Sequence, residues 1–137
     1  MASTLNPYLS FGGNAREAME FYRDVFGGEL TLNTFGESGA PAGEGADGIM
    51  HAQLTGDHGF TLMGADMPPS EEHRPGNSMS VSLSGGDTAE LHGWWGKLSQ
   101  GGMVLVPLEK QMWGDEFGMC ADRFGTPWMV NIVAPQA

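Results

Sequence analysis

Two copies of one pattern run through the sequence, and this repeat restricts the fold more than any other feature does. In each copy a glycine precedes a segment with helical periodicity, and a pair of aromatic residues follows that glycine by eight and nine residues. Each helical segment ends at a Gly-Gly pair, and each copy closes with a hairpin whose turn contains a glycine. The matched positions are Gly13 and Gly86, Phe21-Tyr22 and Trp94-Trp95, Gly27-Gly28 and Gly101-Gly102, and Gly59 and Gly125. We therefore expect two modules with the same order of strands and helix.

The first copy begins with a predicted strand at residues 6–11, which is followed by a helix. Asn14 is a suitable N-cap, and Glu17 lies three residues later, where its side chain can reach back toward the cap. Apolar residues then recur at helical spacing, at Ala15, Ala18, Met19, Tyr22, Val25 and Phe26. Segments of alternating polarity predict further strands at residues 29–35, 49–55 and 60–64.

The second copy predicts a strand at residues 78–84 and a helix capped by Asp87, with Glu90 three residues later. The apolar stripe of this helix consists of Leu91, Trp94, Trp95 and Leu98. A strand at 103–107, a connection at 109–113, and a hairpin with strands at 116–121 and 126–132 follow. Side chains alternate along the last strand, with Trp128, Val130 and Ile132 on an apolar side and Met129 and Asn131 on the other.

Each copy reads β-α-β-β-β and has a sheet face that it cannot cover alone. We therefore predict a single α+β domain over residues 1–137, built from modules at about residues 5–65 and 77–134. The two βαβββ modules form a curved, eight-stranded mixed sheet around a cavity, with the helices outside. Residues 36–48 and 65–76 are polar and rich in glycine or proline, which predicts loops, the first of them mobile.

Charge and composition exclude several classes of partner. The net charge is −11, from 17 acidic and 6 scattered basic residues, so no basic patch exists to bind nucleic acid or an anionic membrane surface. No apolar run approaches the ~20 residues of a membrane-spanning helix. We expect no secretory signal, because no basic and apolar leader pattern is present. The single cysteine, Cys120, permits no internal disulfide, and it predicts a buried structural thiol in a cytoplasmic protein.

Several motifs carry a resemblance to a known family. They are NPYLSF, GNAREAMEFYRDVFGGEL, MHAQL and WGDEFGMCADRFGTPWMVN, which together cover nearly the whole chain outside the two loops. The sequence resembles the vicinal oxygen chelate superfamily, which contains glyoxalase I, extradiol dioxygenases and bleomycin- and fosfomycin-resistance proteins, and within it the PhnB-like group. The resemblance implies paired βαβββ modules, a homodimer, and a ligand site inside each curved sheet.

The resemblance also implies where a metal would bind. Metalloenzymes of the superfamily hold a divalent ion with side chains from the first and last strand of each module. The last-strand positions, four residues after each turn glycine, hold Met63 and Met129, and the first-strand positions fall near Pro7 and near Ser78 or Ser80. None of these is His, Glu or Asp, and thioethers and hydroxyls are poor ligands for the ions that this fold uses. We therefore expect no tightly held metal and no other cofactor.

His51 is the histidine with the most informative position. On its strand, Met50, Ala52 and Leu54 share one face and should lie under the helix, whereas His51 and Gln53 share the other face, toward the cavity. His51 could act as a general base, as a hydrogen-bonding contact to a ligand, or as one arm of an unusual metal site. The alternative is a neutral imidazole bonded to a side chain of a neighbouring strand.

The other candidate ligand contacts lie on strand faces and near the last hairpin. Together with His51, they are Gln53, Met63, Ser78, Ser80, Trp113, Met129 and Asn131. Trp113 is either an aromatic lid over the ligand or a packing residue at a helix or dimer interface. Thioethers, hydroxyls and amides without an arginine cluster favour a small uncharged or aromatic organic ligand over a strong anion. We expect the remaining histidines to be solvated, namely His58, His73 and His92.

Two classes of function remain open. A third, non-functional alternative is a dimeric scaffold whose cavity is filled by its own side chains. In the first, the protein acts by binding a small molecule, as the sequestering resistance proteins of the superfamily do. In the second, it is an isomerase, lyase or dioxygenase that uses His51 with Glu109 or Glu116, with or without a displaced metal site. Either glutamate could reach the cavity mouth, although a solvated surface position accounts better for Glu116, since Glu is rarely buried unpaired.

Overall fold

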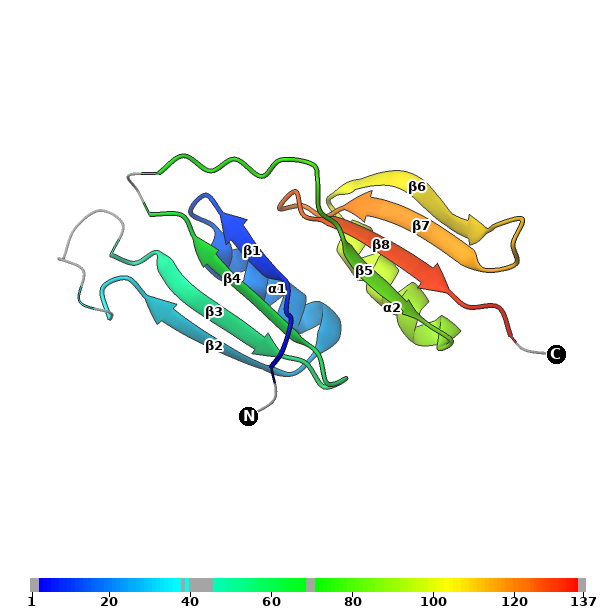
Figure 1. Cartoon of the computed structure of the whole chain (residues 1–137), viewed down its shortest axis with the longest axis horizontal. Coiled ribbons are helices and arrows are strands. Elements are labelled where there is room, and N and C mark those ends of the chain that lie inside the picture. The colour runs from blue at the N-terminus through cyan, green and yellow to red at the C-terminus, as the bar shows by residue number, and fades with distance from the viewer. Residues whose placement is uncertain (1–2, 38, 40–45, 69–70, 136–137) are drawn as a thin grey trace. The chain divides into compact units, whose positions relative to one another are not determined.

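The computed structural model describes residues 3–37, 39, 46–68 and 71–135 of the chain (Figure 1). The chain divides into two compact units, Met1–Pro75 and Gly76–Ala137, and each unit has its own helix, sheet and core. The division between the units falls close to the boundary between the two sequence repeats.

The first unit is a helix packed on one face of a four-stranded mixed sheet. Its elements are β1 (Tyr8–Phe11), α1 (Ala15–Phe26), β2 (Glu29–Thr34), β3 (Ile49–Thr55) and β4 (Thr61–Asp66). The strand order is β1-β4-β3-β2, with β1 parallel to β4 and the other pairs antiparallel. In Figure 1, α1 lies behind this sheet, so the opposite sheet face carries no helix of the unit.

The second unit repeats this arrangement. Its elements are β5 (Val81–Gly85), α2 (Thr88–Ser99), β6 (Met103–Lys110), β7 (Glu116–Ala121) and β8 (Pro127–Ile132). The strand order is β5-β8-β7-β6, and β5 is parallel to β8. The predicted fold class is therefore confirmed as α+β with two βαβββ modules, whose eight strands form two four-stranded mixed sheets.

The helical periodicity of α1 accounts for the core of the first unit. All six residues of its predicted apolar stripe are buried. They pack with the sheet residues whose side chains point toward the helix, which include Phe11, Ile49, Ala52, Leu54 and Leu62. Because strand side chains alternate, the residues between these positions project from the other face of the sheet.

The core of the second unit is formed by α2 and the helix-facing side of its sheet. Leu91, Val130 and Ile132 are buried, and Leu83, Trp94, Trp95 and Leu108 pack around them while partly exposed. Cys120 is fully buried in the same unit, as predicted. Burial, together with the negative charge of Asp122, raises the pKa of the Cys120 thiol to about 11. The thiol is therefore protonated at neutral pH and a poor nucleophile.

Both predicted N-cap residues occupy the N-cap position, but only Asp87 caps its helix with its side chain. Asn14 makes no side-chain cap hydrogen bond, and Asp66 at the end of β4 accepts instead from the backbone amides of Gly13, at 3.0 Å, and Ala15, at 2.9 Å. The Asp66 carboxylate also accepts from Ile49 N at 2.9 Å, so it satisfies more backbone donors than the Asn14 side chain could. In α2, the Asp87 side chain accepts from Glu90 N at 3.0 Å, as expected.

Several strand boundaries also differ from the sequence prediction. β4 extends to Asp66, and β6 extends through Glu109, which was expected in a connection. Met50 is exposed and does not lie under α1, because the pairing of β2 with β3 skips it: Asn33 pairs with His51, and Thr34 with Ile49. A β-bulge of this kind shifts the alternation of side chains by one residue.

The loop predicted at residues 36–48 lies partly outside the described residues, at 38 and 40–45, and its mobility stays a prediction. Its described ends are joined by backbone hydrogen bonds, from Phe35 N to Gly48 O at 3.0 Å and from Gly36 N to Ala46 O at 2.9 Å. These bonds continue the β2–β3 pairing beyond the strands.

Candidate functional site

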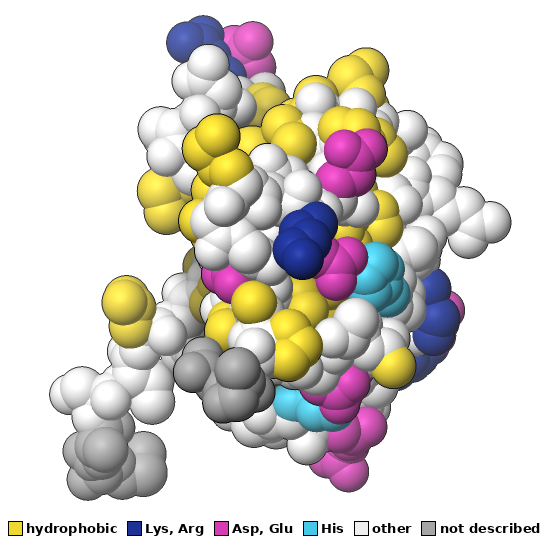
Figure 2. All heavy atoms as spheres, turned by 90° about the vertical axis from the view of Figure 1, so that its right-hand side faces the viewer, with side chains coloured by type: hydrophobic (Ala, Val, Ile, Leu, Met, Phe, Trp, Pro, Cys, Tyr) yellow, Lys and Arg dark blue, Asp and Glu magenta, His cyan; other side chains and the backbone are white. Residues whose placement is uncertain are grey.

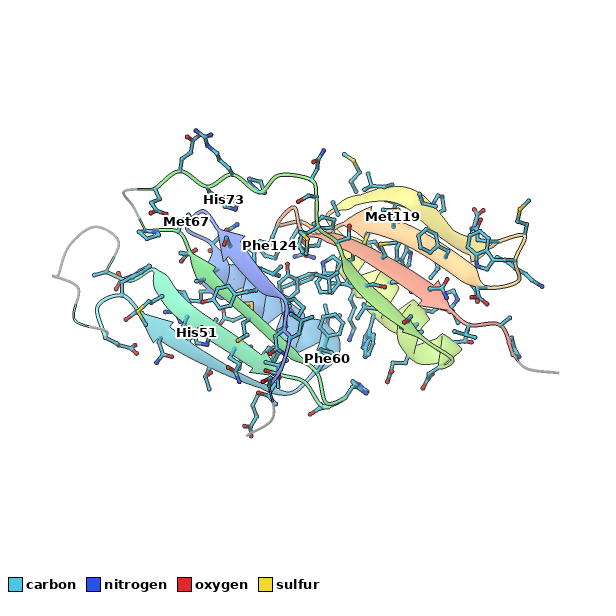
Figure 3. The ribbon with its side chains drawn as sticks, in the orientation of Figure 1. His51, Phe60, Met67, His73, Met119 and Phe124 are labelled. Carbon is cyan, nitrogen blue, oxygen red and sulfur yellow. The ribbon has the colours of Figure 1, made fainter. Side chains whose placement is uncertain are left out.

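The helix-free face of the first sheet brings several of the predicted ligand contacts together. Tyr8 of β1 pairs with Met63 of β4, which pairs in turn with Gln53 of β3, so the three side chains lie in one row. His51 lies two residues from Gln53 on β3 and therefore shares this face (Figure 3). We call this surface, formed by Tyr8, His51, Gln53 and Met63, the first open face.

A hydrogen bond joins the two aromatic side chains of the first open face. The Tyr8 hydroxyl lies 3.0 Å from His51 Nδ1, and the ring centroids are 5.7 Å apart at 32°. Since β4 lies between β1 and β3, this bond crosses over a strand. Sequence reasoning missed Tyr8, although the alternation of Leu9 and Phe11 toward the core would have placed it on this face.

The helix-free face of the second sheet is less polar. Ser82 of β5 pairs with Met129 of β8, which pairs with Met119 of β7, and Asn131 pairs with Phe117. We call these five residues the second open face. The predicted contacts Met129 and Asn131 belong to it, on the side opposite the buried Trp128 and Val130.

Three other predicted contacts lie elsewhere in the second unit. Ser78 and Ser80 precede β5 and are exposed, and the strand register places Ser82 beside Met129 instead. Trp113 follows β6, is 60% exposed, and has its ring 6.3 Å from that of Phe117. It therefore lies beside the second open face without being buried.

Asp115 holds the end of the second open face together, and sequence reasoning also missed it. Its carboxylate accepts from Asn131 Nδ2 at 3.1 Å and from Ala134 N at 2.8 Å. The backbone hydrogen bond, followed by the side-chain one, lowers the pKa of Asp115 below its usual value of 3.8. The Asn131 amide is therefore oriented by a carboxylate, with its carbonyl oxygen left as an acceptor.

The two candidate catalytic glutamates are placed differently. Glu116 does not join an open face: His92 Nε2 of α2 lies 2.9 Å from its carboxylate, and it shares the helix-facing side of β7 with Gly118 and Cys120. Glu109 pairs with Phe117 and is exposed. His51 belongs to the first unit and both glutamates to the second, so neither unit by itself contains the pair that the enzyme hypothesis needs.

The remaining histidines include two that are not simply solvated. His92 is bonded to Glu116, as above. His73 is half-buried, and Figure 3 shows it on the segment beside β1, where its Nε2 donates to Ser10 O at 2.8 Å. The prediction of solvation is wrong for the half-buried His73, whereas His92 is exposed as expected, with a contact to Glu116 that was not predicted. His58 is exposed in a turn and stacks on Phe60, with ring centroids 6.3 Å apart.

The two βαβββ units and their open faces correspond to a known superfamily. The sequence model of the Glyoxalase/Bleomycin resistance protein/Dioxygenase superfamily matches residues 4–130. The chain belongs to this superfamily. None of the described helices of this superfamily member is long and apolar enough to cross a membrane.

Several relatives of this superfamily member cover nearly its whole length. Protein PA1353 from Pseudomonas aeruginosa is 38% identical, with a TM-score of 0.88, over 98% of this chain and 100% of its own. A PhnB protein from Bacillus cereus is 25% identical, with a TM-score of 0.77, over 96% of this chain and 100% of its own. Protein YjdN from Escherichia coli strain K12 is 29% identical, over 96% of this chain and 97% of YjdN. The resemblance to the PhnB-like group is thereby confirmed.

The residues of this superfamily member do not fit the metal site of the superfamily's metalloenzymes. The resemblance locates the ligands at Met63 and Met129 and on the first strands, where the register places Tyr8 and Ser82 beside the two methionines in place of the expected Pro7 and Ser78 or Ser80. A phenol, a hydroxyl and two thioethers match hard or borderline divalent ions poorly. Within the described ranges, no group of three or more His, Cys, Asp or Glu side chains could hold a metal ion.

Proposed function

We propose that this PhnB-like protein binds a small uncharged or aromatic organic molecule on its open faces, without a tightly held metal. The observation that carries the proposal is the composition of these faces. The first offers a phenol–imidazole pair, an amide and a thioether, and the second offers two thioethers, a phenyl ring, a hydroxyl and an oriented amide.

This composition suits an uncharged ligand for two reasons. Thioethers are polarizable and flexible, so Met63, Met119 and Met129 can adapt to an aromatic ring and contact it favourably. The polar groups beside them provide hydrogen bonds for orientation, which is the usual arrangement of a small-molecule site. Neither open face includes an arginine or lysine to neutralise a strong anion.

We also propose that the protein is a cytoplasmic homodimer. The dimer is supported by the apolar edge strand β6, on which Met103, Val104 and Leu105 are 64%, 48% and 52% exposed. Light scattering coupled to size-exclusion chromatography measures the assembly directly. A monomeric mass at micromolar protein concentration would contradict the dimer without affecting ligand binding.

Methyl NMR of the methionines tests ligand binding at both open faces. Protein labelled with [13C-methyl]methionine is titrated with acetophenone, a small uncharged aromatic ketone. We expect the methyl signals of Met63, on the first open face, and of Met119 and Met129, on the second, each to move along a saturable curve. Met19, which is buried in α1 with no exposed surface, is the control within the same molecule and should not move.

Other outcomes would contradict the proposed function. If the open-face methyl signals stay in place while exposed methionines such as Met79 and Met112 move, acetophenone is only adsorbing to the surface. If Met19 moves as much as Met63, the probe is perturbing the fold. Single replacements of Met63 and Met129 by leucine assign the signals and preserve the volume of the side chains.

A further inference from the structure

The Tyr8–His51 contact is compatible with two arrangements of the imidazole proton, and one of them is favoured. A neutral imidazole has one N–H donor and one acceptor nitrogen. With Tyr8 Oη 3.0 Å from His51 Nδ1, either the phenol donates to a bare Nδ1 or Nδ1–H donates to the phenol. A phenol is the stronger hydrogen-bond donor, and an imidazole nitrogen is the stronger acceptor. The first arrangement is therefore favoured, and it places the proton on Nε2.

The fold itself does not require this pair. In the second unit, the strand register places Ser82 beside Met129 as Tyr8 lies beside Met63, and Phe117 occupies the position that corresponds to His51. A serine and a phenylalanine cannot form a hydroxyl–imidazole bond, yet that sheet has the same strand order. The pair is thus a feature of the first open face alone, which points to recognition and away from sheet stability.

We infer that Tyr8 is a positioning residue that holds His51 as the Nε2–H tautomer, and that the first open face binds its ligand through a hydrogen-bond-accepting oxygen such as a ketone carbonyl. The ligand class rests on the proposed function. The ligand class follows from the Tyr8–His51 hydrogen bond: because Nδ1 is bonded to Tyr8, Nε2–H is the group that His51 offers to a ligand. His51 is half-buried beside Met63 and Gln53, so an aromatic ketone can place its ring on the thioether and its oxygen at the imidazole.

The tautomer can be measured without any ligand. Long-range 1H–15N correlation spectra of 15N-histidine-labelled protein, recorded at about pH 8.5 where imidazoles are ordinarily neutral, distinguish the two tautomers. His73, whose Nε2 donates to the Ser10 carbonyl, is a reference for the Nε2–H form in the same spectrum. We expect His51 to match His73 in the wild type and to become a mixture of tautomers in Tyr8→Phe, while His73 stays unchanged.

A matched pair of probes tests the ligand class. Acetophenone and α-methylstyrene are nearly equal in size, and they differ by exchange of a carbonyl oxygen for a methylene group. We expect His51→Leu to weaken acetophenone binding about fivefold, since one hydrogen bond is lost, while the affinity for α-methylstyrene changes less than about twofold. His51→Gln, whose amide N–H can approach the position of Nε2, should recover most of the acetophenone affinity.

Each outcome supports or overturns a stated part of the inference. A wild-type His51 with Nδ1–H, or a tautomer that Tyr8→Phe leaves unchanged, overturns the positioning role. If His51→Leu weakens the binding of both probes equally, the ligand class is overturned, and the proposed small-molecule site still stands. If neither probe shifts any open-face methionine signal, the proposed function fails together with the ligand class. The positioning role of Tyr8 is then still tested by the 1H–15N spectra, which need no ligand.

Discussion

Asp66 and Asp87 show that single aspartates cap the two helices in different ways. Asp87 is the local N-cap of α2, whereas Asp66 reaches the start of α1 from β4, more than 50 residues away in sequence. The same carboxylate accepts from Ile49 N and therefore joins the helix start, β4 and the start of β3. Asn14 occupies the N-cap position of α1, but its side chain makes no capping hydrogen bond, and Asp66 caps the helix instead.

Replacement of Asp66 should accordingly cost more stability than replacement of Asn14. Asp66→Ala leaves three backbone donors without their acceptor, and we expect the free energy of unfolding to fall by about 2–4 kcal/mol. Asn14→Ala is the matched control and should change it by less than about 0.5 kcal/mol. Urea denaturation followed by circular dichroism measures both. Equal losses in the two variants would show that Asn14 acts as the cap in solution.

The lowered pKa of Asp115 predicts how the stability of the protein depends on pH. Its two hydrogen bonds lower the pKa below 3.8 in the folded state, so it stabilises the fold above its ordinary pKa. That contribution is lost as pH falls through the lowered value. The difference in stability between wild type and Asp115→Asn should therefore shrink between about pH 6 and about pH 3, as measured by urea denaturation. Asp24→Asn, which changes a 74% exposed side chain, should show no such trend.

The candidate site shows which residues a single sequence can identify. Strand alternation placed His51 and Gln53 on one face, because a period of two needs no knowledge of neighbouring strands, whereas Met63 was found from the resemblance, four residues after the turn glycine. Tyr8 was missed because its role depends on the register between β1 and β4. The contact of Glu116 with His92 was missed for a similar reason, since only the packing of α2 on β7 brings the two side chains together.

At the scale of elements, the helices and most strands were predictable, and the irregular strands were not. The bounds of α1, α2, β3 and β7 follow from periodicity and from flanking glycines. The bulge that exposes Met50 and the irregular pairing of β6 with β7 depend on partner strands. Sequence alternation alone could not show that β6 continues through Pro107 to Lys110, because bulges interrupt the period of two.

The close packing of α2 on β7 predicts opposite effects of two glycine replacements. A Cβ at Gly118 would lie 2.8 Å from Leu108 Cα and 2.9 Å from Trp95 Cη2, so Gly118→Ala should destabilise the protein by about 1–3 kcal/mol. Gly93 in α2 has nothing within 4 Å of such a Cβ. Gly93→Ala should therefore stabilise the protein by about 0.5–1 kcal/mol, since alanine favours helix. Thermal unfolding measures both, and destabilisation by Gly93→Ala would contradict this account of the helix.

At the scale of the whole molecule, one repeat supports two chemically different open faces. Both units place a methionine of the last strand beside a residue of the parallel first strand, Met63 with Tyr8 and Met129 with Ser82. The resemblance implies that the superfamily's metalloenzymes hold their ion near these positions, yet the residues here are not suited to hard or borderline ions. The fold is thus separable from the metal chemistry, since these positions project from the sheets and add nothing to the cores under the helices.

Metal binding should therefore be absent from the wild type and recoverable by design. Protein purified without chelator should contain substoichiometric Ni, Zn, Mn and Fe by elemental analysis, and titration with each ion should leave its melting temperature unchanged. The Tyr8→His, Met63→Glu double variant places an imidazole beside a carboxylate on adjacent parallel strands, and Zn²⁺ should raise its melting temperature. The Leu9→His, Met63→Glu variant is a matched control, because residue 9 points to the core side and cannot share an ion with residue 63. A stoichiometric ion in the wild type would show that other side chains form a metal site, and it would make the enzyme hypothesis, with His51 as the first ligand to replace, the leading one.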